Sequence, residues 1–121
     1  MEMVLFASRM RDMPPEDAAE YQTLLQRMLE LASAAPGFIS HKTYTAPDGE
    51  RMTVVLFDSA ENAARWANLP EHRQAQQRGR ERFYAEYRVY AGPVTRSYSF
   101  SPQTGRRLEQ PGPGARQDAG R

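Results

Sequence analysis

Cysteine is absent from the 121 residues of this chain. Its absence excludes disulfide bonds, thiol nucleophiles and zinc or iron–sulfur centres held by cysteine. The chain also has almost no excess of positive over negative charge. Its formal net charge is +1, which gives no reason to expect nucleic acid or an anionic membrane as a partner. No apolar run approaches the roughly 20 residues that span a bilayer, and Glu2, Arg9 and Arg11 do not fit an export signal. We therefore expect a cytoplasmic protein.

The composition is that of one ordinary domain followed by a tail. Hydrophobic residues make up 40% of the chain, which is enough for a single core. Residues 101–121 are mostly Gly, Pro, Gln and Arg, with one leucine. Such a segment buries too little apolar surface to offset the entropy that it loses on ordering. We predict a domain over residues 1–100 and a disordered tail over residues 101–121.

The first third of the chain has the pattern of a strand followed by a helix. Residues 3–10 alternate, with apolar side chains on both faces, as in a strand. A helix is expected to begin at Pro15, with acidic residues in its first turn, and to end before Gly37. Its apolar stripe fits a helix packed on a sheet and comprises Tyr21, Leu24, Leu25, Met28, Leu29, Leu31 and Ala32.

The middle of the chain predicts a hairpin and a short helix. Residues 38–45 and 52–57 are extended runs, and the turn residues between them favour adjacent antiparallel strands, with the apolar second run in the centre of the sheet. Asp58 or Ser59 can then cap a helix that reaches about Asn68, and Glu61 stands where a capping box has its acid.

A second helix is expected to begin at Pro70, since proline suits a first helical position. Steps of three and four residues place the following on one side: His72, Ala75, Gln76, Gly79 and Phe83. A purely structural helix carries more leucine or isoleucine on its inward side. Because this side is half polar, we predict that it faces a cavity.

A fourth strand is expected from about Tyr84 to Phe100, with a bulge at Gly92 and Pro93 where the alternation shifts by one residue. The predicted order is therefore strand, helix, strand, strand, helix pair, strand. Helices on one face of such a sheet leave the other face bare, and that face also carries large apolar residues. A homodimer that packs sheet against sheet would cover it.

Several motifs spread over residues 3–100 resemble the antibiotic biosynthesis monooxygenase family of dimeric α/β-barrel proteins. The residues that carry this resemblance are Pro36-Gly37-Phe38, Asp58-Ser59, Trp66, Pro70-Glu71-His72, Ala75-Gln76, Gly79-Arg80, Phe83-Tyr84 and Tyr87. The resemblance implies an α+β fold: a ferredoxin-like βαββαβ subunit with an antiparallel sheet, paired with its twin, and a pocket between sheet and helices. The tail is unmatched.

The resemblance also implies a chemistry. Active family members oxidise an electron-rich phenol or quinol with O₂ and use no metal or flavin, because an ionised phenol can itself donate an electron to oxygen. Asn62 and Trp66 match the pair that such members point at the substrate oxygens. Haem-degrading relatives use an asparagine on the first strand, and this chain has none there. The two histidines lack a carboxylate at ligand spacing, so we expect no metal and no cofactor.

The predicted site combines these inferences. The expected catalytic residues are Asn62, Trp66 and His72, and the expected substrate-binding residues are Tyr44, Gln76, Arg80 and Tyr84. Each has a structural alternative. An indole is often a packing anchor, a tyrosine can pack in the core with its hydroxyl at the edge, and an arginine usually forms salt bridges. His41 lies on a strand, where it can face either a pocket or an interface.

The functional hypothesis is a cofactor-independent monooxygenase that acts on a small aromatic phenol or quinol. In it, Asn62 and Trp66 polarise the substrate oxygen and His72 accepts its proton. Two alternatives stay open. One is a non-catalytic dimeric module that binds a small ligand, and the other is an isomerase or cyclase of the same fold that uses His72 as a base without oxygen.

Overall fold

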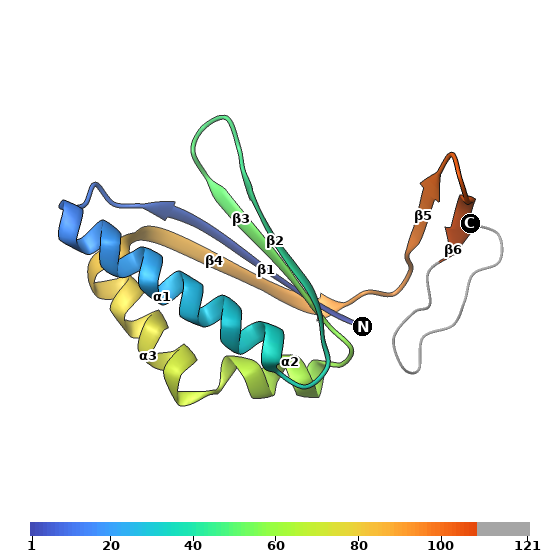
Figure 1. Ribbon diagram of the computed structural model, residues 1–121, viewed down its shortest axis with the longest axis horizontal. Coiled ribbons are helices and arrows are strands. Elements are labelled where there is room, and N and C mark those ends of the chain that lie inside the picture. Colours follow the sequence, from blue (N-terminus) through green and yellow to red (C-terminus); the bar gives the residue numbers. More distant parts are fainter. Residues whose placement is uncertain (109–121) are drawn as a thin grey trace.

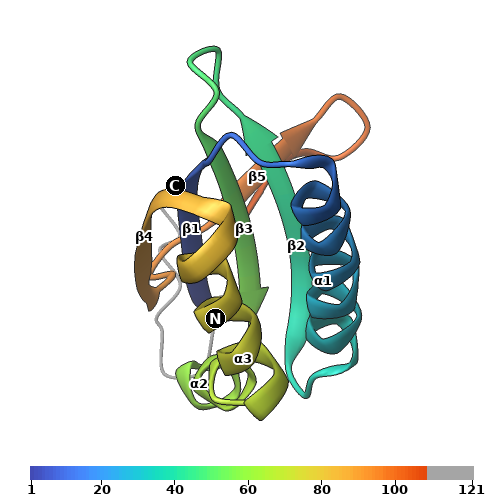
Figure 2. The same cartoon turned by 90° about the vertical axis from the view of Figure 1, so that its left-hand side faces the viewer.

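A computed structural model describes residues 1–108 of the chain. Four antiparallel strands form one sheet in the order β2-β3-β1-β4, and the helices lie together on one face of it (Figures 1 and 2). The elements are β1 (Glu2–Met10), α1 (Pro15–Ala34), β2 (Phe38–Thr45), β3 (Arg51–Phe57), α2 (Ala60–Ala67), α3 (Pro70–Arg78), the π-helix η1 (Gly79–Phe83), β4 (Tyr84–Pro93), β5 (Tyr98–Ser101) and β6 (Gly105–Leu108). This α+β, ferredoxin-like βαββαβ arrangement is the predicted fold.

The turn between α1 and β2 depends on a glycine. Gly37 has φ +80°, a left-handed conformation that glycine adopts without steric cost. A Cβ at this position would overlap the carboxylate of Asp58 and the amide of Asn62. The backbone N–H of Asp58 also donates to the carbonyl of Gly37 at 2.8 Å. The end of α1 is thereby fixed against the start of α2, as the Pro36-Gly37 break in the sequence indicated.

The predicted hairpin is confirmed. β2 and β3 pair antiparallel across the turn at residues 46–50, where Gly49 has φ +92° and the backbone N–H of Ala46 donates to the carbonyl of Glu50 at 2.8 Å. β3 also pairs with β1, so it is a central strand, as its apolar sequence predicted.

The helix pair is confirmed, with two details that the sequence left open. Ser59 caps α2, because its hydroxyl accepts from the backbone N–H of Asn62 at 3.1 Å, whereas Asp58 accepts from the Asn62 side chain. α3 continues into η1, whose carbonyls are bound from outside by Arg11. The Arg11 guanidinium donates to the carbonyls of Tyr84, Glu81 and Arg80 at 2.8, 2.9 and 2.6 Å.

The register divides the sheet residues between two faces. Val4 pairs with Val55, Phe6 with Thr53 and Ser8 with Arg51. Because alternate residues point to opposite faces, these six side chains share one face. Val4 and Val55 pack with Phe57, Ala63 and Trp66 of the core, which identifies this face as the one that the helices cover. Leu5, Val54 and Tyr90 therefore lie on the opposite face.

The fourth strand is shorter than predicted. β4 ends at Pro93, and residues 98–101 form a separate strand, β5, paired only with β6. The reason is the length of its neighbour. Pro93 pairs with Glu2, the first residue of β1, so the sheet offers no partner strand beyond that point. The predicted continuous strand to Phe100 is therefore wrong, and the β5–β6 hairpin projects away from the sheet (Figure 1).

Part of the predicted tail belongs to this hairpin. Residues 101–108, which the composition placed in a disordered segment, include the turn and the second strand, with Arg106 4.2 Å from the centre of the Tyr98 ring. The rest of the predicted tail, 109–121, lies outside the described residues, and the domain boundary at residue 100 stays a prediction. Within the described part of the chain, no helix has both the length and the apolar character needed to cross a membrane.

Candidate functional site

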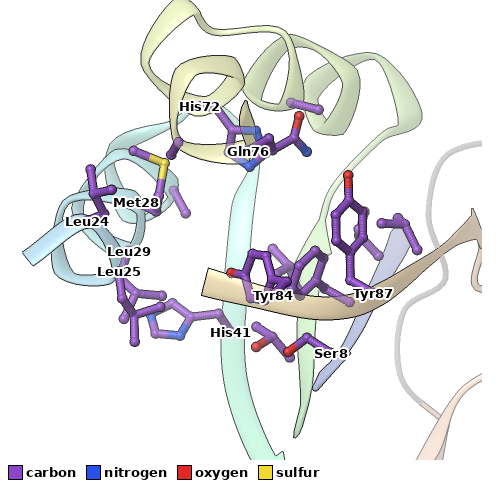
Figure 3. A pocket seen from close by; sticks show the side chains of 18 of the residues that line it. Ser8, Leu24, Leu25, Met28, Leu29, His41, His72, Gln76, Tyr84 and Tyr87 are labelled. Carbon is purple, nitrogen blue, oxygen red and sulfur yellow. The ribbon is translucent and has the colours of Figure 1, made fainter. Parts of the chain in front are cut away.

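A pocket of about 190 Å³ lies between the helix-covered face of the sheet and the helices (Figure 3). α1 contributes most of the predicted apolar stripe: Tyr21, Leu24, Leu25, Met28, Leu29 and Ala32. The sheet contributes alternate residues of β1, β3 and β4. The predicted cavity-facing side of the second helix lines the pocket through His72, Ala75, Gln76 and Phe83. The inference of a cavity from the half-polar helix is therefore confirmed.

Trp66 and His72 meet at one end of this pocket. Trp66 lies in the last turn of α2 and His72 in the first turn of α3, and the connection between the two helices brings their ring centres within 4.4 Å in an edge-on arrangement. The indole Nε1 and the imidazole Nδ1 are both buried, and neither has a hydrogen-bond partner among residues 1–108. Buried polar atoms are almost always hydrogen-bonded, so two unpartnered atoms beside one cavity indicate a place for a ligand.

The ring of His72 is held in its neutral form. Burial lowers the pKa of this histidine, and a hydrogen bond with the backbone of Ala67 only partly opposes that effect. At neutral pH one ring nitrogen of a neutral imidazole accepts hydrogen bonds and protons. His72 is thus suited to take a proton from a ligand.

Gln76 lies one helical turn after His72 on α3 and projects into the same space (Figure 3). Its amide adds both a donor and an acceptor to this part of the wall. The end of the pocket formed by Trp66, His72 and Gln76 is called the indole end below.

Tyr84 lies across the pocket from His72, at the start of β4 (Figure 3). Its ring packs edge-on against Phe6 and Tyr21, with centre distances of 5.4 and 6.2 Å. Burial raises the pKa of the Tyr84 phenol, and Tyr21 raises it further. The hydroxyl therefore stays protonated and can donate a hydrogen bond.

Three of the predicted site residues do not line the pocket. The amide of Asn62 donates to Asp58 Oδ1 at 2.8 Å at the start of α2, so it supports the helix instead of meeting Trp66. Tyr44 is 53% exposed, and its partner Met52 places it on the opposite face of the sheet. Arg80 is held outside by Gln77 and by the hydroxyl of Tyr87, each at 2.9 Å.

Arg51 lines the opposite end of the pocket, where the sequence predicted no site residue. Its Nη1 donates to the hydroxyl of Tyr21 at 3.1 Å, and its guanidinium lies 5.7 Å from the centre of that ring. The buried Ser8 is its cross-strand neighbour. Arg51, Tyr21, Ser8 and Tyr84 form what is called the arginine end below. The alternation of Arg51, Thr53 and Val55 was the available signal, but the third strand was predicted to begin one residue too late.

Two further pocket residues had been left without a role. His41 faces the pocket from β2, which decides between the two alternatives for it, and Tyr87 lines the pocket beside Phe6, with ring centres 5.2 Å apart. Among residues 1–108, no three histidine or acidic side chains gather closely enough to hold a metal ion.

Known proteins are similar to this domain in sequence. Residues 3–78 match the family described as Antibiotic biosynthesis monooxygenase. A protein of Bacillus subtilis, YqjZ, which is described as uncharacterised, is 32% identical over 89 residues, which cover 74% of this chain and 78% of YqjZ.

Solved structures share the fold at lower sequence identity. An antibiotic biosynthesis monooxygenase family structure from Deinococcus radiodurans has a TM-score of 0.68 at 14% identity and covers 84% of this chain and 99% of its own. SnoaB from Streptomyces nogalater, a cofactor-independent oxygenase, has a TM-score of 0.64 at 12% identity, with coverages of 79% and 94%. A dimeric protein with a ferredoxin-like fold from Bacteroides fragilis has a TM-score of 0.57 at 14% identity, with coverages of 75% and 93%.

Proposed function

This chain belongs to the antibiotic biosynthesis monooxygenase family, and we propose that it is a cofactor-independent monooxygenase that oxidises a small aromatic phenol or quinol with O₂. One observation carries the proposal: the rings of Trp66 and His72 meet in the wall of the pocket, and within residues 1–108 neither the buried indole Nε1 nor the buried imidazole Nδ1 has a hydrogen-bond partner. A phenolic oxygen placed between them would satisfy both atoms.

The two rings have complementary roles in this proposal. His72, neutral because it is buried, accepts the proton of the substrate hydroxyl. The N–H of Trp66 then donates to the phenolate oxygen that is left, and its fixed position avoids any reorganisation as the charge develops. The apolar wall from α1 excludes water and holds the aromatic ring flat.

The reaction balances without a cofactor. The electron-rich phenolate reduces O₂, and one oxygen atom enters the ring as a second carbonyl while the other leaves as water with two substrate hydrogens. The substrate supplies all the electrons, so the protein only has to ionise it, orient it and admit O₂.

Asn62 and Arg80 take supporting roles in this proposal, and Tyr44, on the opposite face of the sheet, has none. Asn62 fixes the start of the helix that carries Trp66, through Asp58 and Ser59. Arg80 holds Tyr87, which forms part of the pocket wall. These residues position the site and do not touch the substrate.

Oxygen uptake by purified protein, measured with a panel of phenols and hydroxyquinols, tests the proposal. We expect uptake above the buffer rate, with water and quinone as products. Trp66→Phe and His72→Gln keep much of the packing but remove the indole donor and the base that takes up the proton, and each should abolish uptake. Gln74→Ala is the matched control, because Gln74 is an exposed residue of α3 that does not line the pocket.

The alternatives give different results in the same assay. An isomerase or cyclase would convert its substrate equally well without O₂. A binding module would be stabilised by ligand without any turnover. Either result would overturn the oxygenase proposal, as would uptake that is unchanged in His72→Gln.

The uncovered face of the sheet supports a homodimer. Leu5, Val54 and Tyr90 lie there without a covering layer in the described part of the chain, and Tyr90 is 52% exposed. The Bacteroides fragilis neighbour of the same fold is dimeric. We propose that two copies pack sheet against sheet, so Tyr90→Glu should give a monomer in sedimentation velocity.

A further inference from the structure

The pocket contains one charged side chain. Of the described residues that line it, Arg51 is the one arginine or lysine, and no aspartate or glutamate is among them. A lone cation in a largely apolar cavity is costly unless a partner neutralises it. The composition of the wall therefore favours a ligand with a negative charge.

Arg51 also differs from the other arginines near the β2–β3 hairpin. Arg9 is paired with Asp48 at 2.7 Å and Arg88 with Glu50 at 2.9 Å. Among residues 1–108 Arg51 has no carboxylate within salt-bridge distance, and its one side-chain hydrogen bond goes to the neutral hydroxyl of Tyr21. A guanidinium has five N–H donors, so the bond to Tyr21 leaves other donors that a ligand in the pocket can use.

The distance between the indole end and the arginine end can be estimated along β3. Trp66 packs in the cluster that contains Val55 and Phe57, whereas Arg51 lies four residues earlier on the same strand. Four residues of extended strand span roughly 13 Å. A separation of this size can hold an aromatic system of about two rings between the two ends. Figure 3 shows His72 and Gln76 on one side of the pocket and Ser8 and Tyr84 on the other.

From this arrangement we propose that Arg51, supported by Tyr21, is an anion-binding subsite, and that the ligand is an aromatic hydroxy acid. Its carboxylate accepts from the guanidinium of Arg51, while its hydroxyl reaches Trp66 and His72 at the other end. The hydroxyl end rests on the proposed function, but the carboxylate end does not. Charge-assisted and bidentate hydrogen bonds are among the strongest that a protein makes, so this subsite selects the substrate.

Isothermal titration under nitrogen tests the subsite without turnover. Three ligands share one ring system: 2-naphthol has only the hydroxyl, 2-naphthoic acid only the carboxylate, and 6-hydroxy-2-naphthoic acid both. We expect the hydroxy acid to bind about tenfold or more tightly than 2-naphthol, because hydrogen bonds to a charged group contribute at least that much.

Variants of Arg51 test whether this residue causes the preference for acids. Arg51→Gln should weaken both acids about tenfold or more and leave 2-naphthol within about twofold, since only the charge is lost. Arg51→Lys keeps the charge but not the planar fork, and it should recover part of the affinity. Arg88→Gln is the matched control: it removes an arginine on the other face of the sheet, and should change none of the three affinities.

Three results would overturn the subsite. These are equal binding of the hydroxy acid and 2-naphthol, an equal loss for all three ligands in Arg51→Gln, and no binding of any ligand. The first two leave the oxygenase proposal intact, because they concern only the carboxylate. In turn, a preference for acids that depends on Arg51 stands even if no phenol consumes O₂.

Discussion

The indole and arginine ends of the pocket are built in different ways. The indole end comes from one short stretch of chain, where the turn between α2 and α3 brings Trp66 and His72 into edge contact. The arginine end joins Tyr21 of α1, Arg51 of β3 and Tyr84 of β4, which meet only when the sheet and helices assemble. The first end is local and neutral, whereas the second is non-local and carries the charge.

The two ends also differ in the interaction that each of them lacks. The indole end has two buried polar atoms without partners, and the arginine end has a cation without a carboxylate among the described residues. Unpaired groups of this kind reduce stability, and proteins retain them where a ligand supplies the missing interaction. We therefore expect each end to bind a different chemical group of one ligand: a hydroxyl at the indole end and an anion at the arginine end.

The largest effect is expected from Gly79→Ala, which should damage the arginine end. A Cβ at Gly79 would lie 2.5 Å from the ring of Tyr84, so the ring must move into the pocket. Overpacking of this kind should lower the free energy of unfolding by about 2 kcal/mol. Urea unfolding measures the change. Gly92→Ala, with no atom within 4 Å of the added Cβ, is the control, and equal losses in both variants would contradict the expectation.

A somewhat smaller effect is expected from Arg11→Ala, which acts on the same end from outside. Three guanidinium bonds to the carbonyls of η1 and Tyr84 would be lost. Because the side chain is exposed and water can replace it, the free energy of unfolding should fall by about 1–2 kcal/mol. Hydrogen exchange should rise in η1 and stay unchanged in α2.

Arg73→Ala is the control for that experiment, since Arg73 is an exposed residue of α3. A similar rise in exchange at α2 in Arg11→Ala would show that Arg11 stabilises the whole domain and does not act on one end.

Trp66→Phe should have little effect on stability while removing the function of the indole end. The smaller ring loses some packing against Phe57, whose centre is 5.4 Å away, but the substitution also deletes a buried N–H without a partner. The two changes oppose each other, so the free energy of unfolding should stay within about 1 kcal/mol of the original. A loss of several kcal/mol in urea unfolding would mean that the N–H is bonded.

The smallest effect is a pH dependence that belongs to the indole end. The folded pKa of His72 is lowered from 6.5, so the unfolded chain binds more protons as the pH falls below that value. The stability that His72 contributes in its neutral form is complete above about pH 6.5 and is lost as the pH falls toward the folded pKa. His72→Gln should flatten the stability profile between about pH 5 and 8, measured by urea unfolding across that range.

The difference between the two ends also explains which residues the sequence could predict. Helical spacing in a single stretch predicted that His72 and Gln76 share one side, and both line the pocket, whereas Trp66 was expected from the family resemblance. Arg51 and Tyr21 were not predicted as site residues, because alternation along the third strand can assign Arg51 to a face but cannot show that Tyr21 of α1 lies beside it. Only the pairing of β3 with β1, and the packing of α1 across them, brings the two together.

The errors have the same origin. Asn62 shares a face with Trp66 by spacing, but Asp58 and Gly37 at the helix start hold its amide away from the pocket. Tyr44 alternates correctly along β2, yet the register with Met52 assigns it to the uncovered face. The fourth strand was predicted to be too long, because its end depends on where β1 begins. Each error concerns a partner that is distant in the sequence.

The sequence by itself determined the order of strands and helices, the apolar stripe of α1, the half-polar side of α3 and hence the presence of a cavity. Periodicity, turn residues and capping act over a few residues, so they can be read along the chain. The tertiary structure alone decided that the far end of the cavity is cationic. Strand register and helix packing are fixed by burial over the whole domain, and a shift of one residue would have turned Arg51 to the other face of the sheet.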